Sequence, residues 1–136
     1  MNDKIINYII WLLMLVMFGY FAFSKGWIFN DFENISIEEA KKIINQDKNL
    51  VILDVRSNAE YQRDYIAHAI NIPFVKLEEN LAQLDSFKSK KILVYSERAI
   101  RSVKASRLLC EYGFDIIHLK GGMVFWIRKG YEVSNP

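Results

Sequence analysis

Residues 50–55 read LVILDV, a short run with a single polar side chain and three β-branched ones. Two later segments have the same character, 91–95 (KILVY) and 115–119 (DIIHL). Short apolar runs rich in β-branched residues are typical of strands that are buried on both faces of a sheet. The sequence therefore predicts three buried strands.

Helix-like segments separate these strands. In residues 36–39 (SIEE), Glu follows Ser by three positions, a capping box that predicts the start of a helix running to about Asn45. Further helix-like segments span 58–65, 75–84, 101–112 and 123–129. Alternating strands and helices predict an α/β fold, a mostly parallel sheet flanked by helices on both faces. In such sheets the functional loops follow the carboxyl ends of the strands, here after Val55 and Tyr95.

The N-terminal segment has a different composition. Residues 5–23 contain no charged side chain, and as a helix they would be about 28 Å long, close to the hydrocarbon thickness of a bilayer. We predict a transmembrane anchor in residues 1–28, in contact with the lipid bilayer through residues 5–23, and a folded domain in residues 29–136. The protein is then a single-pass membrane protein.

Two features of this segment stay open. A cleaved signal peptide is the alternative to a retained anchor, because Ala22-Phe23-Ser24 has the small-x-small pattern that a peptidase needs. Lys4 and Lys25 lie on opposite flanks, so the side of the membrane on which the domain lies is undetermined.

Charge and cysteine content exclude several classes of function. The 18 basic and 16 acidic residues are interspersed, with a net charge of +2, so we expect no nucleic-acid partner. With Cys110 as the only cysteine and His68 and His118 as the only histidines, we expect neither a metal site nor a cofactor. The remaining candidate partners are a protein at the membrane and a small anion.

Several short motifs occur together in a fixed order. They are 53–57 (LDVRS) with Glu60 and Tyr61, 69–73 (AINIP), 94–95 (VY) followed by 101–102 (RS), 113–114 (GF), 119–123 (LKGGM) and Trp126. In this order and spacing, over nearly all of residues 35–133, the chain resembles the rhodanese-like (sulfurtransferase) family. The resemblance implies that family's parallel sheet, with its functional loop directly after the strand 91–95.

The loop itself departs from the family pattern. Members that transfer sulfur carry Cys-x-x-Gly-x-Arg there, and backbone N–H groups and a helix dipole stabilise a thiolate that carries a persulfide. Here the loop reads Ser96-Glu97-Arg98-Ala99-Ile100-Arg101. The resemblance places Ser96 at the Cys position, and an alcohol neither ionises near neutral pH nor forms a persulfide. Ala99 replaces a glycine, the residue that adopts left-handed backbone angles without cost.

The charged residues around this loop have several possible roles. Arg98 and Arg101, at a helix N-terminus, are candidates to bind an anion, with Glu97 offsetting part of their charge. For Arg101 a second role stays open, bracing the loop through its carbonyls, and we expect solvation for Arg98. We expect Arg56 to line the same mouth, as the family's Arg does, and Asp54 to bind backbone N–H groups.

Neither histidine lies close enough to Ser96 in the sequence to act as its general base, and the cysteine does not lie close enough to replace the missing thiol. A serine needs a hydrogen-bonded general base, and neither histidine falls in the loop. We expect His68, where the family commonly has Gly, in a surface turn, and His118 as a hydrogen-bonded residue on a sheet face. Cys110 lies nine residues beyond Arg101, about 13 Å along a helix, too far to replace the thiol.

The leading hypothesis is a membrane-anchored rhodanese-like domain that is inactive as a sulfurtransferase, has no catalytic residue, and acts as a binding or scaffolding module with a residual anion pocket. The alternative is a thiosulfate or persulfide sulfurtransferase with atypical or partner-supplied thiol chemistry. An enzyme that handles phosphoryl groups is less favoured, because the phosphatases that share this fold and loop also rely on the missing cysteine.

Overall fold

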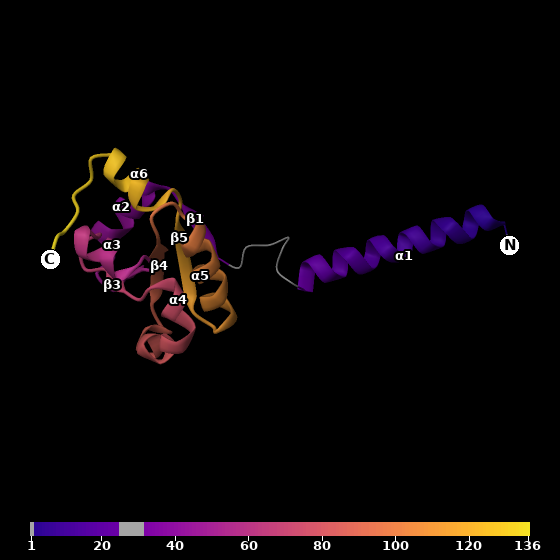
Figure 1. The fold of residues 1–136 in the computed structure, drawn as a ribbon, viewed down its shortest axis with the longest axis horizontal. Helices are drawn as coiled ribbons and strands as arrows, with labels where there is room; N and C mark the ends of the chain where they lie inside the picture. Colours follow the sequence, from indigo (N-terminus) through magenta and orange to yellow (C-terminus); the bar gives the residue numbers. More distant parts are fainter. Residues whose placement is uncertain (1, 25–31) are drawn as a thin grey trace. The chain divides into compact units, whose positions relative to one another are not determined.

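The computed structural model describes residues 2–24 and 32–136. Contacts divide the chain into two compact units, Met1–Asp31 and Phe32–Pro136. The predicted boundary between residues 28 and 29, and the flanking Lys25, lie outside the described residues. In the first unit, helix α1 (Asp3–Ser24) is long and apolar enough to cross a membrane (Figure 1).

The second unit is built on a five-stranded sheet in the order β1-β5-β4-β2-β3. All four strand pairs are parallel. The strands are β1 (Glu33–Ile35), β2 (Val51–Asp54), β3 (Ile70–Asn71), β4 (Lys91–Tyr95) and β5 (Asp115–Leu119). Strands β4 and β5 match the predicted segments, and β2 is one residue shorter at each end. The central strand β4 pairs with β2 on one side, where Asp54 lies opposite Tyr95, and with β5 on the other.

The helices follow the predicted alternation, with one correction. They are α2 (Ile37–Gln46), α3 (Asn58–Arg63), α4 (Phe74–Leu77), the 3₁₀ helix η1 (Glu78–Phe87), α5 (Ile100–Glu111) and α6 (Gly122–Arg128). The single helix predicted for 75–84 is wrong, because α4 gives way to η1 and Asn80 has non-helical backbone angles. The Asn80 side chain donates to the Lys76 carbonyl at 2.7 Å, the local competition that makes Asn unfavourable inside helices.

Apolar clusters cover both faces of the sheet. On one face, side chains of α4, η1 and α5, including Leu77, Leu84 and Leu109, pack with Leu53 and Val94. On the other face, side chains of α2 and α6 pack with the remaining sheet residues, among them Ala40, Met123, Trp126, Leu93 and Ile117. The prediction of a mostly parallel sheet flanked by helices on both faces is therefore confirmed. The ribbon in Figure 1 shows α5 beside β4 and β5.

The predicted capping box starts α2. Ser36 Oγ accepts from the Glu39 amide at 3.2 Å, and a Glu39 carboxylate oxygen accepts from the Ser36 amide at 2.8 Å. A second box, Ser57 with Glu60, starts α3. This second box bears on the candidate site, because it fixes the carboxylate of Glu60.

Candidate functional site

The loop between β4 and α5, residues 96–101, is called the site loop below. It begins at the carboxyl end of the buried central strand, where sequence reasoning placed it, and it runs into the first turn of α5. A hollow of about 230 Å³ is lined by Ser96, Glu97, Arg98, Ile100 and Arg101. All five belong to the predicted loop.

Ser96 is fully buried and hydrogen-bonded at the base of this loop. Its Oγ accepts from the Ser102 amide at 3.1 Å and donates to the Ser102 hydroxyl at 3.0 Å. Ser102 lies in the first turn of α5, so the helix N-terminus holds the Ser96 hydroxyl. Sequence reasoning did not single out Ser102 as a partner of Ser96.

His118 continues this hydrogen-bonded chain. Its Nε2 lies 2.8 Å from Ser102 Oγ, and its Nδ1 lies 2.8 Å from Asn34 Oδ1 on β1. Burial lowers the pKa of His118 to about 4, so the imidazole is neutral at pH 7. The expectation of a hydrogen-bonded histidine on a sheet face is confirmed. Neither histidine falls in the site loop, but Ser102 lies between Ser96 and His118 and is hydrogen-bonded to both.

Ala99 lies in the left-handed region, with φ of 73°. This is the conformation that a glycine adopts freely and that costs other residues about 1–2 kcal/mol. The loop thus keeps a glycine-type backbone although the glycine is absent.

Arg56 does not line the mouth of the hollow, contrary to the expectation. Its side chain is 0 % exposed, and its guanidinium donates to Asp54, Asp64 and Glu97. Burial by itself lowers the pKa of Arg56, but the hydrogen bonds and charge of Asp54, together with the hydrogen bonds of Glu97 and Asp64, outweigh it and the pKa lies above its ordinary value. Asp54 also accepts from the Arg56 backbone amide at 2.8 Å, as predicted. Arg56 therefore stabilises the site loop through its partly buried ion pair with Glu97.

Arg101 forms an ion pair with Glu60 and also lines the hollow. Its Nη1 and Nη2 donate to the two carboxylate oxygens of Glu60, both at 2.7 Å. Mainly because of these bonds, the pKa of Glu60 falls to about 2. The capping box at Ser57 orients Glu60 from the other side. Glu60 was noted in the sequence only as part of a motif, and nothing local indicates its partner.

The remaining charges of the loop are Glu97 and Arg98. Glu97 accepts from Arg56 at 3.0 Å and from Arg63 at 3.4 Å. Arg98 is exposed and forms no ion pair with any residue that the structure describes. Arg98 is therefore the arginine of the site loop whose charge no ion pair offsets within the described residues 2–24 and 32–136.

Helix α6 closes the site loop from one side. The amides of Met123 and Val124 donate to the carbonyls of Ser96 and Glu97, at 2.9 and 3.2 Å. A Cβ on Gly122, which has φ of +62°, would lie 2.2 Å from the Ser96 carbonyl oxygen. Only glycine permits so close an approach.

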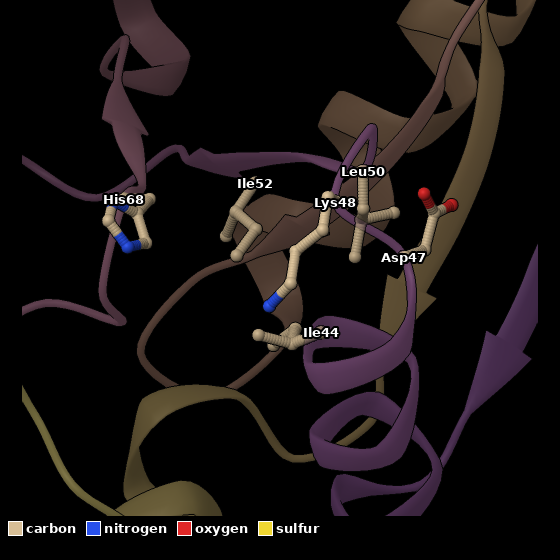
Figure 2. A pocket seen from close by; sticks show the side chains of 6 residues that line it. All are labelled: Ile44, Asp47, Lys48, Leu50, Ile52 and His68. Atoms are coloured by element: carbon tan, nitrogen blue, oxygen red, sulfur yellow. The ribbon is translucent and has the colours of Figure 1, made fainter.

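The other singled-out residues lie elsewhere. His68 is exposed in a turn with φ of 67°. It borders a separate hollow of about 280 Å³, whose wall includes Ile44, Ile52 and Lys48. Figure 2 shows the Lys48 side chain reaching over Ile44, with His68 on the far side of Ile52. Cys110 is partly buried near the end of α5 and packs against the cluster on that face of the sheet.

Comparisons with known proteins agree with this fold. The model of the rhodanese-like domain matches residues 36–129. A crystal structure of a rhodanese-related protein from Thermoplasma volcanium is similar over 77 % of this chain and 100 % of its own, with TM-score 0.71 and 31 % identity. A rhodanese-like domain protein from Staphylococcus aureus is similar over 77 % and 99 %, with TM-score 0.69 and 27 % identity.

Curated relatives differ in length. The chain is 38 % identical over 96 residues to a tRNA uridine(34) hydroxylase of Cytophaga hutchinsonii, covering 67 % of this chain but 31 % of the relative. It is 33 % identical over 96 residues to the thiosulfate sulfurtransferase GlpE of Coxiella burnetii, covering 70 % of this chain and 87 % of the relative. The chain thus spans under a third of the hydroxylase and most of the sulfurtransferase.

Proposed function

This chain belongs to the rhodanese-like domain family, and we propose that it is a membrane-anchored member that does not transfer sulfur from thiosulfate. In this proposal the domain binds a protein partner or a small anion at the site loop. The observation that carries it is Ser96, which stands where the family's sulfur-carrying cysteine is expected.

The surroundings of Ser96 support the loss of sulfur transfer. Its hydroxyl donates one hydrogen bond and accepts another, both with Ser102, an arrangement suited to a neutral alcohol. A persulfide needs a thiolate sulfur. Cys110 sits near the far end of α5 and cannot supply one to the loop.

The charges of the loop limit what it binds. Glu60 holds Arg101 and Glu97 faces Arg56, so two of the nearby cations are already neutralised. Arg98 and the N-terminus of α5 remain to attract a negative group. We expect weak binding of small anions, and a protein carboxylate fits the same features.

The membrane part of the proposal rests on α1. Its 22 residues suffice to cross a bilayer core, and its large apolar side chains, such as Trp11 at 67 % and Leu15 at 71 %, are exposed. Carbonate extraction of membranes tests this part: the full chain stays in the pellet if α1 is a retained anchor. An intact mass that lacks the residues up to Ser24 would remove the anchor from the proposal.

Thiosulfate:cyanide sulfurtransferase turnover by the purified full chain tests the rest. We expect no rate above the uncatalysed background for the wild type and measurable turnover for Ser96→Cys, because the Ser102 amide and the α5 dipole would stabilise a thiolate there. Ser106→Cys is the matched control, because Ser106 lies one turn beyond Ser102 in α5. This variant should stay inactive. Robust turnover by the wild type would contradict the proposal.

A second candidate is a sulfurtransferase that works with a partner's thiol. The likeness to the Coxiella burnetii sulfurtransferase, of which the chain covers 87 %, favours it. It predicts cyanide-dependent turnover that appears only when a second thiol protein is added. Hydroxylation of tRNA is not carried over, because the chain spans 31 % of the relative with that name.

A further inference from the structure

Four polar side chains from four parts of the fold form one buried chain of hydrogen bonds. Ser96 Oγ lies 3.0 Å from Ser102 Oγ, Ser102 Oγ lies 2.8 Å from His118 Nε2, and His118 Nδ1 lies 2.8 Å from Asn34 Oδ1. Ser96, Ser102 and His118 are at most 2 % exposed. The loss of sulfur chemistry at Ser96 does not account for this arrangement.

The partners set the direction of the protons. Asn34 Oδ1 is an acceptor, so Nδ1 of His118 carries the imidazole proton and Nε2 accepts. The Ser102 hydroxyl then donates to Nε2, its shortest contact, in preference to the Ala99 carbonyl at 3.1 Å. The Ser96 hydroxyl in turn donates to Ser102. The two hydroxyl protons therefore point from Ser96 toward His118, and the Nδ1 proton of His118 points on toward Asn34.

This is the arrangement of an activated serine with one hydroxyl inserted. A nucleophile, a base and a group that orients the base recur in serine enzymes of unrelated folds, and geometry rather than chain order identifies them. We propose that Ser96 is an acyl-accepting nucleophile whose proton passes through Ser102 to His118, giving the domain a slow esterase or thioesterase activity. This activity is independent of the sulfur transfer discussed above.

The chemical step balances within these residues. Ser96 Oγ forms a bond to the carbonyl carbon while its proton moves to Ser102 and the proton of Ser102 moves to His118 Nε2. The carbonyl π pair moves to oxygen, where the positive N-terminal end of the α5 dipole stabilises the anion. The alcohol or thiol then leaves with the proton from His118, and water releases the acyl group by the reverse route.

The hollow limits the substrate. It measures about 230 Å³ and is bordered by Ile100, which is 70 % exposed, and by Arg98 and Arg101. Ser96 borders this hollow but is 0 % exposed, so an acyl group reaches its hydroxyl only when the side chains over it move aside, which favours short acyl groups over long ones. Arg98 at the rim favours an ester or thioester with a negatively charged leaving group.

Covalent labelling of the full chain by diisopropyl fluorophosphate tests the proposal. The serine displaces fluoride and gains a diisopropylphosphoryl group, which intact mass and peptide mapping locate. We expect a single adduct on Ser96, absent in Ser96→Ala. The labelling rate should fall about 10²-fold or more in Ser102→Ala and in His118→Gln, and Ser102→Thr, which keeps the hydroxyl, should restore most of it.

Ser106→Ala is the matched control. Ser106 lies four residues further along α5, is buried, and has a hydroxyl with no hydrogen-bond partner in the part of the chain that the structure describes. Its removal should leave the labelling rate unchanged, and circular dichroism checks that each variant is folded. The absence of an adduct on Ser96, or equal rates in folded wild type, Ser102→Ala and His118→Gln, would overturn the proposal.

Discussion

The loops after β2 and after β4 lie side by side, since Asp54 and Tyr95 are paired at the ends of their strands, and both present arginine. After β2, Arg56 is 0 % exposed and donates to three acidic residues. After β4, Arg98 is exposed and Arg101 is 37 % exposed. Burial, more than residue type, separates the two loops: the arginine of the first is enclosed by acidic residues, and the arginines of the second are exposed to solvent.

Two ion pairs tie these loops together in opposite directions. Arg56 of the first loop pairs with Glu97 of the second, and Arg101 at the end of the second pairs with Glu60 on the helix that follows the first. Each loop therefore fixes the other. Substitutions at these ion pairs, at the contact between α6 and the site loop, and at Ala99 therefore test how the two loops hold each other.

Replacement of Arg56 by Met should have the largest effect. It leaves Asp54 buried without its counter-charge, which typically costs about 3–5 kcal/mol. Urea denaturation followed by circular dichroism measures the loss. The double variant Asp54→Asn with Arg56→Met should recover a large part of the lost stability. A loss below about 1 kcal/mol for Arg56→Met alone would show that the ion pairs of the buried Arg56 side chain do not stabilise the fold.

Gly122→Ala should come next. The new Cβ would lie 2.2 Å from the Ser96 carbonyl oxygen and would be strained at φ of +62°, so we expect a loss of about 3 kcal/mol from the two costs together. Gly113→Ala is the control, because φ there is +85° and nothing lies within 4 Å of the Cβ. It should cost about 1–2 kcal/mol. Equal losses would mean that α6 does not press on the site loop.

Glu60→Gln should have a smaller and pH-dependent effect. The pKa of Glu60 is about 2 against an ordinary 4.5, so its pairing stabilises the fold fully above pH 4.5, and this contribution is lost as the pH falls toward 2. Both partners are partly exposed, which limits the difference from wild type to about 1 kcal/mol at pH 7.

Thermal unfolding between pH 7 and pH 3 measures this difference. Glu38→Gln is the control, because Glu38 pairs with Lys129 across an exposed surface, with side chains 51 % and 55 % exposed. That variant should be indistinguishable from wild type at pH 7. A difference between wild type and Glu60→Gln that grows on acidification would contradict the assigned direction of the pKa shift.

Ala99→Gly should have the smallest effect, a gain in stability of up to about 1 kcal/mol. Glycine relieves the cost of φ at 73° but adds entropy to the unfolded chain, so the two contributions partly cancel. The midpoint of urea denaturation is the measurement. A clear loss of stability would mean that the Ala99 methyl group makes a packing contact that outweighs the strain.

Most of the fold was predictable because its signals are local. The strands at 91–95 and 115–119 and the capping box at Ser36 are readable within a few residues of sequence. Strands β1 and β3 were missed, because they contain three and two residues at the edges of the sheet and have no apolar run. The kink at Asn80 was also missed, because it depends on a side-chain bond.

The position of the site loop was predictable, but its partners were not. Residues 96–101 follow from the end of a buried strand. The bond between His118 and Asn34 joins residues 84 positions apart, and that between Arg101 and Glu60 joins residues 41 apart. Such contacts depend on the order of the strands in the sheet, which local patterns do not encode. For the same reason the sequence predicted Arg56 at the mouth of the hollow, whereas the structure buries it among acidic side chains.

In the proposed function, Ser96 prevents sulfur transfer although the rest of the site loop is intact. Intact mass of the full chain after exposure to thiosulfate tests this proposal most directly. We expect the wild type to gain no mass and Ser96→Cys to gain one sulfur atom, removed again by cyanide. Sulfur gained by the wild type would contradict the loss of sulfur transfer. A folded Ser96→Cys variant that gains none would contradict the claim that the rest of the loop is intact.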